Sequence, residues 1–242
     1  SLVHSVRNDR ACRKSIYAAR YVARLIDSGF TDSEVSESLQ KRYRGSAAKP
    51  IDVSESPMKG SAGARVTLVE FVDYECPHCK RAQPLLRQVL DEYKGDVKVH
   101  FKHYPLAQHA NARLAAEGAV AAAKQGKFWE YNDKVWANSE SLSPAELEKY
   151  AKDVGLDVAK WRKDYEDPKT KLRVQRDRSD GAALEIESTP TIFINGRKFM
   201  QYGHADFPEQ LREWLKTELT LLAGPKPPMI PANAASQPSG GP

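Results

Sequence analysis

The chain has 242 residues, a formal net charge of +5 and a mean hydropathy of −0.61. This length allows one substantial core plus an appendage, and no apolar run in the sequence is long enough to cross a bilayer. The 37 basic residues are interleaved with 32 acidic ones, without the alternation of aromatic and basic residues that a nucleic-acid platform needs. We therefore expect a globular protein that does not bind nucleic acid.

Residues 1–45 predict a two-helix module. The stretch "RKSIYAARYVARLIDSG" places its apolar residues on one stripe at helical spacing, and Gly29 stands at the C-cap position. The sequence "TDSE", from Thr31 to Glu34, is a capping box that opens a second helix. Neither helix can bury its apolar face alone, so the two should pack on each other or on another surface. Residues 46–64 are rich in Gly, Ser, Ala and Pro, which predicts a linker or a chain that wraps the surface.

Residues 65–105 predict a strand–helix–strand unit. The stretch "RVTLVEFVDY" is typical of a buried strand, "PHCKRAQPLLRQVLDEYKG" of a helix that includes Pro84, and "DVKVHFKHY" of a second strand. Such a unit requires a right-handed crossover onto a parallel sheet. The sequence therefore predicts an α/β fold in which Cys76 and Cys79 lie between a buried strand and the start of a helix.

The rest of the chain predicts a helical region, a hairpin and a last helix. Residues 106–187 have a helical pattern throughout, as in "SLSPAELEKYAKDVG", where Ser143 is an N-cap. Residues 188–223 contain two strands joined at Asn195-Gly196, the strongest short hairpin signal, and then an amphipathic helix. Residues 224–242 bury too little apolar area to offset the entropy of ordering, so we expect a disordered tail.

The pair Cys76 and Cys79 could belong to a zinc site, a haem attachment point, a structural staple or a redox-active disulfide. Zinc needs four ligands and the sequence offers one CxxC pair, while a c-type haem needs His where this chain has Lys80. A staple that closes so small a loop restricts the unfolded chain little. The position at a helix start favours redox chemistry, because the helix N-terminus stabilises a thiolate at Cys76. We expect the Cys76 sulfur at the surface and the Cys79 sulfur shielded one turn further along the helix. We expect no metal and no cofactor.

The motifs "VEFVDYECPHC" and "STPTIFING", separated by a long helical stretch, resemble those of the thioredoxin superfamily. More narrowly, they are similar to the DsbA-type periplasmic thiol-disulfide oxidoreductases, over residues 58–222. The resemblance implies a thioredoxin fold with an inserted helical domain, here preceded by the short N-terminal helical pair. It further implies a monomer outside the cytoplasm that acts on reduced exported proteins and is reoxidised by a membrane partner, which in this family is a quinone-linked protein.

The resemblance also implies roles for individual residues. Cys76 is the nucleophile and Cys79 its resolving partner, and the two form a disulfide in the oxidised state. Pro190 is a cis-proline that faces this disulfide, and Thr189 before it offers its backbone to an extended substrate peptide. Glu70, on an otherwise apolar strand, matches the buried acid that assists proton movement at the second cysteine.

Pro77 and His78 form the dipeptide that is typical of the oxidising members of this family. Because His78 lies near the helix start, it can donate hydrogen bonds and positive charge to the Cys76 thiolate. This stabilises the reduced form and makes the disulfide a stronger oxidant. Four other histidines are expected to be surface or packing residues: His100, His103, His109 and His204.

The expected function is donation of a disulfide to exported proteins through a mixed-disulfide intermediate. Two alternatives remain open: a reductase or isomerase on the same fold, and a non-catalytic binding or chaperone module in which the CxxC is structural. Cys12 is either a free thiol or the partner of a cysteine further upstream. The opening "SLVHSVRNDR" lacks the apolar core of a signal peptide, so we expect that an exported protein of this sequence has already been trimmed.

Overall fold

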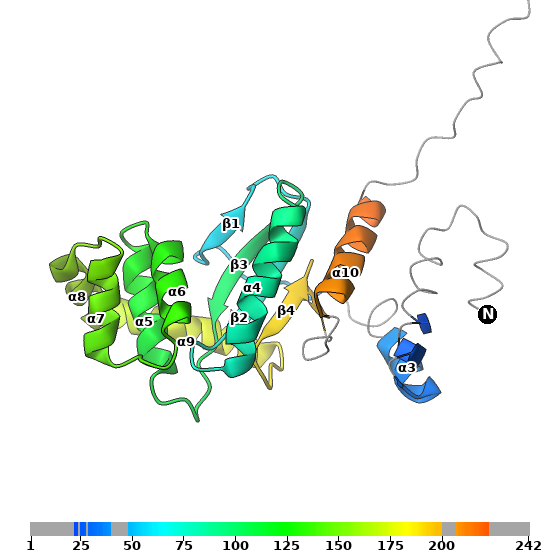
Figure 1. Cartoon of the computed structure of the whole chain (residues 1–242), viewed down its shortest axis with the longest axis horizontal. Coiled ribbons are helices and arrows are strands. Elements are labelled where there is room, and N and C mark those ends of the chain that lie inside the picture. The colour runs from blue at the N-terminus through cyan, green and yellow to red at the C-terminus, as the bar shows by residue number, and fades with distance from the viewer. Residues whose placement is uncertain (1–21, 24, 28, 40–47, 200–206, 223–242) are drawn as a thin grey trace, which may run out of the picture.

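The computed structural model describes residues 22–23, 25–27, 29–39, 48–199 and 207–222, arranged as Figure 1 shows. Its strands are β1 (Met58–Gly60), β2 (Val66–Val72), β3 (Val97–His103), β4 (Thr191–Ile194) and β5 (Arg197–Phe199). Its helices include α3 (Asp32–Leu39), α4 (Pro77–Glu92), α5 (Ala112–Ala123), α6 (Phe128–Ala137), α7 (Pro144–Asp153), α8 (Val158–Glu166), α9 (Pro168–Ala183) and α10 (Phe207–Leu222). None of the helices in these ranges combines the length and apolar character needed to span a membrane.

The five strands form one sheet in the order β1-β3-β2-β4-β5. β2 and β3 are parallel and are connected through α4, so the predicted strand–helix–strand unit is confirmed. β4 and β5 are antiparallel and meet at Asn195-Gly196, whose φ values of 48° and 77° are those that a type I′ turn requires. The predicted hairpin is therefore confirmed.

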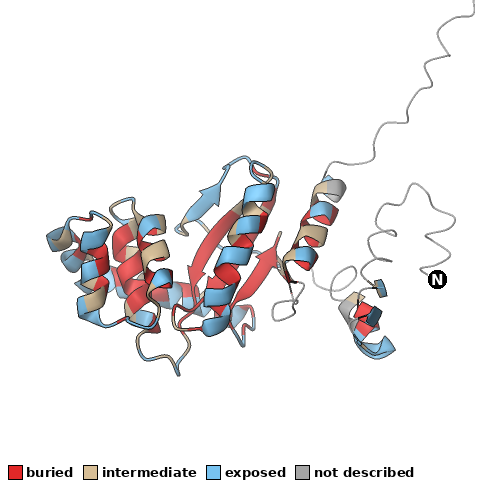
Figure 2. Cartoon of the chain, in the orientation of Figure 1, coloured by how far each residue is buried: buried red, intermediate tan, exposed pale blue. Residues whose placement is uncertain are grey.

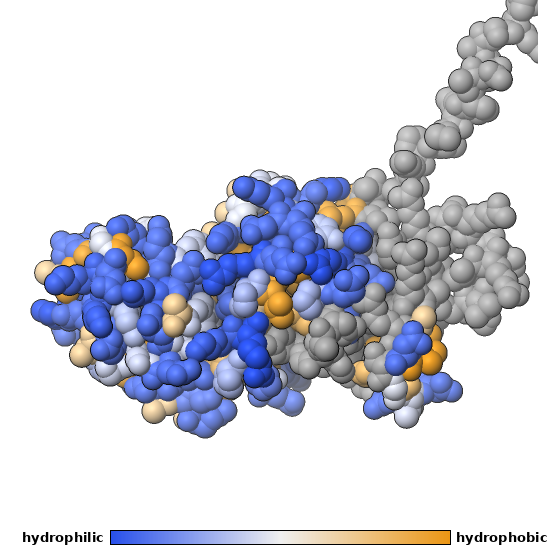
Figure 3. All heavy atoms as spheres, viewed as in Figure 1, coloured by the Kyte–Doolittle hydropathy of each residue, from blue (hydrophilic) through white to orange (hydrophobic). Residues whose placement is uncertain are grey.

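Two helices, α4 and α10, cover one face of the sheet. They bury a cluster of apolar side chains against the strands: Val66, Leu68, Leu86, Val89, Val97, Val99, Ile192, Ile194, Phe199, Phe207, Leu211, Trp214 and Leu215. Figure 2 shows the central strands as the most buried part of the molecule, and Figure 3 shows a largely hydrophilic surface over α4. The amphipathic pattern of both helices is thus explained by this one apolar layer.

The helices between β3 and β4 form a bundle at one end of the molecule (Figure 1). The alanine-rich α5 lies at its centre and contacts α6, α7, α8 and α9. Close packing explains the small residues, because a Cβ added at Gly118 would lie 2.5 Å from the Tyr131 hydroxyl oxygen. At the start of α7 the Ser143 side chain accepts a hydrogen bond from the Glu146 backbone N–H, which confirms the predicted N-cap.

Residues 48–64, predicted as a linker or a surface chain, pack along the sheet and extend it. Ile51 and Val53 pack against the apolar cluster on the face opposite α10, and β1 pairs with the edge of β3. The carboxylate of Glu55 forms ion pairs with α9, 2.6 Å from Arg176 Nη1 and 3.5 Å from Arg173 Nε. The chain here is therefore part of the folded body.

The described part of the N-terminal module has a small core of its own. Leu25 and Val35 are buried together, as expected for two helices that shield each other's apolar faces. The Thr31 N–H donates to Glu34 Oε2 at 2.8 Å and the Glu34 N–H donates to Thr31 Oγ1 at 3.4 Å, so the predicted capping box is confirmed. Most of the first predicted helix, Cys12, His204 and the predicted tail lie outside the described residues.

His103, the last residue of β3, is buried among aromatic rings and is 1% exposed. Within the described chain, neither of its ring nitrogens has a hydrogen-bond partner, and burial lowers its pKa to about 4. The native state therefore excludes a proton that the unfolded chain binds below pH ~6.5.

We expect His103→Leu to remove part of the acid sensitivity of the fold. As the pH falls from 6.5 to 4, the original protein should lose on the order of 3 kcal/mol of unfolding free energy through this one group. The variant should not show that loss. Denaturant unfolding at several pH values measures the difference, and parallel pH profiles for the two proteins would show that His103 does not titrate in this way.

Candidate active site

Cys76 occupies the N-cap of α4, and Cys79 follows within the first turn of the helix. The apolar β2 ends at Val72, and a short loop delivers Cys76 to a helix whose first residue is Pro77, a residue well suited to that position. Both cysteines are free thiols in this structure. The Cys76 sulfur therefore lies at the N-terminal end of α4, and the Cys79 sulfur lies about one turn further along the helix.

Thr189 and Pro190 lie opposite this helix start, although they are more than 100 residues away in the sequence. The peptide bond between them is cis, and β4 begins directly after it. As a thiol, Cys76 donates a hydrogen bond to the Thr189 carbonyl oxygen at 3.2 Å. The structure thus brings together both cysteines and the Thr189-Pro190 pair singled out in the sequence.

The two thiols have opposite electrostatic environments. A hydrogen bond from the Cys79 thiol is the largest of the effects that lower the pKa of Cys76 to about 5. Burial opposes this shift, whereas the Thr189 side chain and the backbone N–H groups of Cys79 and His78 reinforce it. The pKa of Cys79 is raised well above its usual value, chiefly by burial and then by its interactions with Cys76. At neutral pH the pair therefore consists of a Cys76 thiolate and a Cys79 thiol.

The Thr189 hydroxyl is buried and lacks a hydrogen-bond partner among the described residues in this dithiol form. When either sulfur is a thiolate, this hydroxyl can donate a hydrogen bond to it, and in this way the Thr189 side chain lowers the pKa of Cys76 and of Cys79. A hydroxyl can rotate its proton toward a newly formed thiolate at little cost. Thr189 is thus placed to respond to the charge that thiol-disulfide exchange creates.

Cys76 is less accessible than the sequence suggested. Its side chain is only 5% exposed, and with Cys79 it belongs to the apolar cluster that joins the sheet edge to the helical bundle. The expectation of a sulfur at the surface is wrong, because the hydrophobic packing of α4 against the bundle, together with Thr189, covers it. The exposed residues of the motif are Pro77 and His78.

The hydrogen bond from His78 that lowers the pKa of Cys76 comes from its backbone N–H. The imidazole Nδ1 instead lies 2.9 Å from Nη2 of Arg81, one turn further along α4. Sequence reasoning had emphasised the imidazole. The geometry adds a contribution from the backbone, which any residue except proline could make at this N-terminal position of the helix.

Glu70 lies on β2 and is 2% exposed. Burial raises its pKa to about 7, partly offset by a hydrogen bond from Gln83 and by the charge of Arg87. The Gln83 Nε2 group donates to Glu70 Oε2 at 3.1 Å, and Gln83 stands one turn after Cys79 on α4. The carboxyl group is therefore half-protonated near neutral pH and lies under the helix that carries the cysteines.

Two carboxylates next to the motif were missed by sequence reasoning. The carboxylate of Asp73 accepts hydrogen bonds from the Glu75 and Leu106 backbone N–H groups, both at 2.7 Å, and its Oδ2 lies 2.8 Å from His109 Nδ1. His109 thus has a defined partner, in addition to the surface or packing role expected for it.

Glu75 accepts hydrogen bonds from the first backbone N–H groups of α5, which carry an unsatisfied partial positive charge. The loop before Cys76 is therefore fastened to the helical bundle by Asp73 and Glu75. The only sequence signal was the pair of acids flanking Tyr74 in "VDYECPHC". Within the described residues, no three His, Cys, Asp or Glu side chains gather in the way a metal site requires.

Comparison with known proteins agrees with this architecture. The family model described as Thioredoxin matches residues 52–217. An oxidised BdbD from Bacillus subtilis superposes with a TM-score of 0.65 at 24% identity, covering 72% of this chain and 98% of that one. A thiol-disulfide exchange protein, α-DsbA2 from Wolbachia pipientis, gives a TM-score of 0.60 at 20% identity, covering 76% of this chain and 94% of that one.

Among curated proteins, one relative is a Na(+)/H(+) antiporter, NhaA 3 from Salinispora tropica, which is 38% identical over 150 residues. That match covers 62% of this chain and 23% of the antiporter, so the chain spans about a quarter of the length of such relatives. The structural neighbours establish the fold, a five-stranded sheet with an inserted helical bundle as in DsbA-type proteins. With the family match covering most of its length, the chain belongs to the thioredoxin family.

Proposed function

We propose that this protein is a thiol-disulfide oxidoreductase that donates the Cys76–Cys79 disulfide to reduced proteins. The observation that carries the proposal is the unequal pair of thiols, with the pKa of Cys76 lowered to about 5 and that of Cys79 raised, facing Thr189-Pro190. A stabilised thiolate favours the reduced dithiol, and a pair that prefers to be reduced is an oxidant of other thiols.

The first step is attack of a substrate thiolate on the Cys76 sulfur of the oxidised protein. The Cys76–Cys79 bond breaks, a substrate–Cys76 disulfide forms, and Cys79 leaves as a thiolate. Because the buried Cys79 has a raised pKa, it takes up a proton at once. Glu70, which has a pKa of about 7 and binds Gln83 one turn further along the helix of Cys79, is the group suited to supply this proton. In this intermediate the substrate backbone lies extended beside Thr189-Pro190.

The second step releases the product. A second substrate thiolate attacks the substrate sulfur of the mixed disulfide, so that a substrate disulfide forms and Cys76 departs as a thiolate. Two electrons have then passed to the protein, which holds the Cys76 thiolate and the Cys79 thiol. Cys76 is a good leaving group because its pKa is low. The backbone N–H of His78 and the helix that Pro77 begins stabilise the departing charge.

Continued turnover requires a reoxidising partner that accepts these two electrons. We propose that the partner is a membrane protein, that the substrates are exported proteins, and that the protein works as a monomer outside the cytoplasm, where disulfides persist. The antiport activity named for the longer relatives is not part of this proposal, because the chain spans only about a quarter of their length.

A redox titration tests the direction of the chemistry. The protein, with Cys12→Ser to remove the third thiol, is equilibrated in glutathione buffers, and the reduced fraction of Cys76 and Cys79 is measured by thiol trapping. We expect a midpoint nearer the value of about −120 mV of a strong oxidant than the value of about −270 mV of thioredoxin. A midpoint near the second value would instead favour the reductase, and a disulfide that resists all these buffers would favour a structural staple.

A further inference from the structure

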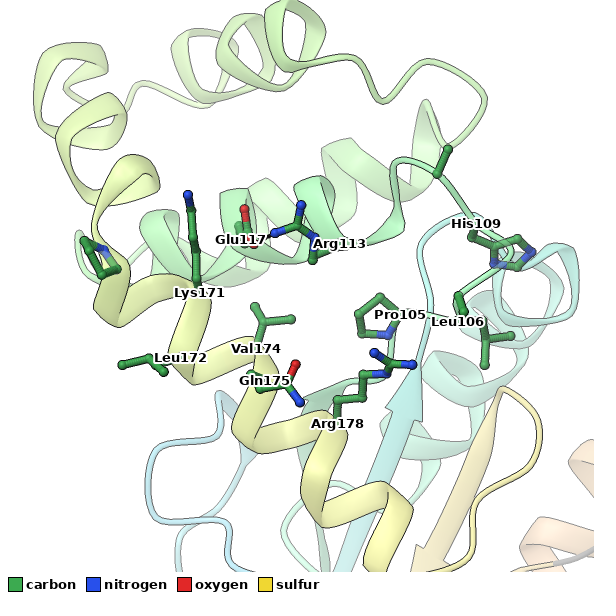
Figure 4. Close-up of a pocket in the computed structure, with 13 residues that line it drawn as sticks. Pro105, Leu106, His109, Arg113, Glu117, Lys171, Leu172, Val174, Gln175 and Arg178 are labelled. Atoms are coloured by element: carbon green, nitrogen blue, oxygen red, sulfur yellow. Dashed lines mark hydrogen bonds and ion pairs between the residues drawn. The ribbon is translucent and has the colours of Figure 1, made fainter.

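A pocket with a volume of about 610 Å³ lies between α5, α9 and the loop that follows β3 (Figure 4). This volume lies within the range of about 300–1,000 Å³ that is typical of ligand sites. Its apolar lining comes mainly from Pro105, Leu106 and Val174, and the exposed Leu172 adds to it. None of the residues that line this pocket takes part in the proposed disulfide exchange.

The pocket is lined by more cationic than anionic side chains. Of the described residues that line it, Arg113, Lys171 and Arg178 are cationic and Glu117 is the one carboxylate. Glu117 is buried and is already paired with Arg113 at 3.0 Å. In the described part of the chain, Lys171 and Arg178 form no ion pair within 4 Å, and both are exposed on α9. Figure 4 shows Lys171 and Arg178 on this helix, flanking Val174 and Gln175.

The pocket adjoins the loop that carries the reactive cysteine. Its lining residues Leu106 and His109 both bind the carboxylate of Asp73, at 2.7 and 2.8 Å. The backbone carbonyl of Asp73 in turn accepts a hydrogen bond from the Cys76 N–H at 3.1 Å. Through Asp73, the wall of the pocket is therefore connected by hydrogen bonds to the loop that carries Cys76.

We propose that this pocket binds an acidic segment of the protein substrate, one that carries an apolar side chain, at a distance from the cysteine that reacts. The apolar lining around Val174 receives the apolar side chain, and the unpaired Lys171 and Arg178 bind the acidic ones. The occupant is a polypeptide, because the lining extends along α9 from Pro168 to Arg178 and two other lining residues, Leu106 and His109, hold Asp73 of the active-site loop. This inference rests on the proposed function and names the class of substrate that it favours.

Direct binding is tested with a fluorescein-labelled peptide of about eight residues that alternates Glu and Leu and contains no cysteine. We expect the fluorescence anisotropy to report binding that salt weakens, and the double variant Lys171→Gln, Arg178→Gln to raise the Kd about tenfold. Arg65→Gln removes one positive charge at the far end of β2, where Arg65 pairs with Asp96, and should leave the Kd unchanged. The same peptide with Lys in place of Glu should not bind.

Equal binding of both peptides, or an unaltered Kd in the double variant, would overturn the proposal. So would calorimetric binding of inorganic phosphate or of a fatty acid together with no binding of the peptide, since the pocket would then hold a smaller anionic ligand. Because the peptide has no cysteine, this assay does not depend on thiol chemistry.

An exchange assay links the pocket to catalysis. Two peptides with paired cysteines, one flanked by Glu and Leu and the other by Lys and Leu, are oxidised by the protein, and each rate is divided by the rate with dithiothreitol. We expect the preference for the acidic peptide to fall about tenfold in the double variant. An unchanged preference overturns the inference alone, whereas absence of exchange with every thiol, dithiothreitol included, overturns the proposed function itself.

Discussion

Cys76→Ser is expected to lower the rate of disulfide donation at least about a thousandfold, because serine cannot form the disulfide that is transferred. Cys79→Ser is expected to fail in a different way. In that variant the Cys76 thiolate, with its pKa of about 5, still reacts with disulfides, but no second sulfur is present to resolve the product. Mixed disulfides should therefore accumulate. The rate at which the oxidised protein forms a disulfide in a reduced dithiol peptide measures the first outcome. Gel shift and mass spectrometry of the protein incubated with an oxidised peptide measure the second.

The matched control for both variants is Cys12→Ser, since it also replaces a thiol with a hydroxyl but lies outside the motif. We expect it to retain disulfide donation. Appreciable disulfide donation by Cys76→Ser would contradict the proposed chemistry. If Cys79→Ser formed no mixed disulfide while Cys76→Ser formed one, the roles of nucleophile and resolving residue would have to be exchanged.

Local signals in the sequence were sufficient to predict much of the fold. The Asn195-Gly196 turn, the Ser143 N-cap and the Thr31–Glu34 capping box are each determined by a few neighbouring residues, and each is found in the structure. The position of Cys76 at the start of α4 was predictable for the same reason, because an apolar strand and an amphipathic helix flank it.

Features that depend on distant contacts were not predictable. β1 has three exposed residues and no alternating pattern, so only its pairing with β3 makes it a strand. The near-complete burial of Cys76 depends on a bundle that begins more than 30 residues later. Asp73 and Glu75 bind groups that follow β3, and no spacing in the sequence links them to those groups. Such partners are determined by tertiary packing, which overrides local preference.

Glu70 was predictable from the sequence only in part. Its presence on an apolar strand suggested burial, and it is buried, but its partner Gln83 could be identified only once β2 and α4 were packed together. The structure also gives its carboxyl group a pKa of about 7 instead of the usual value near 4.5. A group with this pKa exchanges protons readily at neutral pH, and the raised pKa of Cys79 creates the need for such a group.

Glu70→Gln is expected to stabilise the reduced protein at high pH and to slow its chemistry. Between pH 4.5 and 7 the native carboxyl group holds a proton that the unfolded chain has released. The free energy of unfolding is therefore highest below pH 4.5 and falls as the pH rises through 7. The loss amounts to on the order of 3 kcal/mol. Glutamine is neutral at every pH and should abolish it. Denaturant unfolding of both proteins at pH 4.5 and pH 8 measures the change.

The same variant should slow thiol-disulfide exchange by on the order of a hundredfold, because the amide cannot pass a proton to or from Cys79. Its pH–rate profile should also lose an inflection near pH 7. Gln83→Leu is the matched control, since it keeps the carboxyl group but removes the hydrogen bond that lowers its pKa. In that control the inflection should move to higher pH and remain visible. An inflection that stays near pH 7 in Glu70→Gln would assign the proton to another group and reduce Glu70 to a buried acid without a role in exchange.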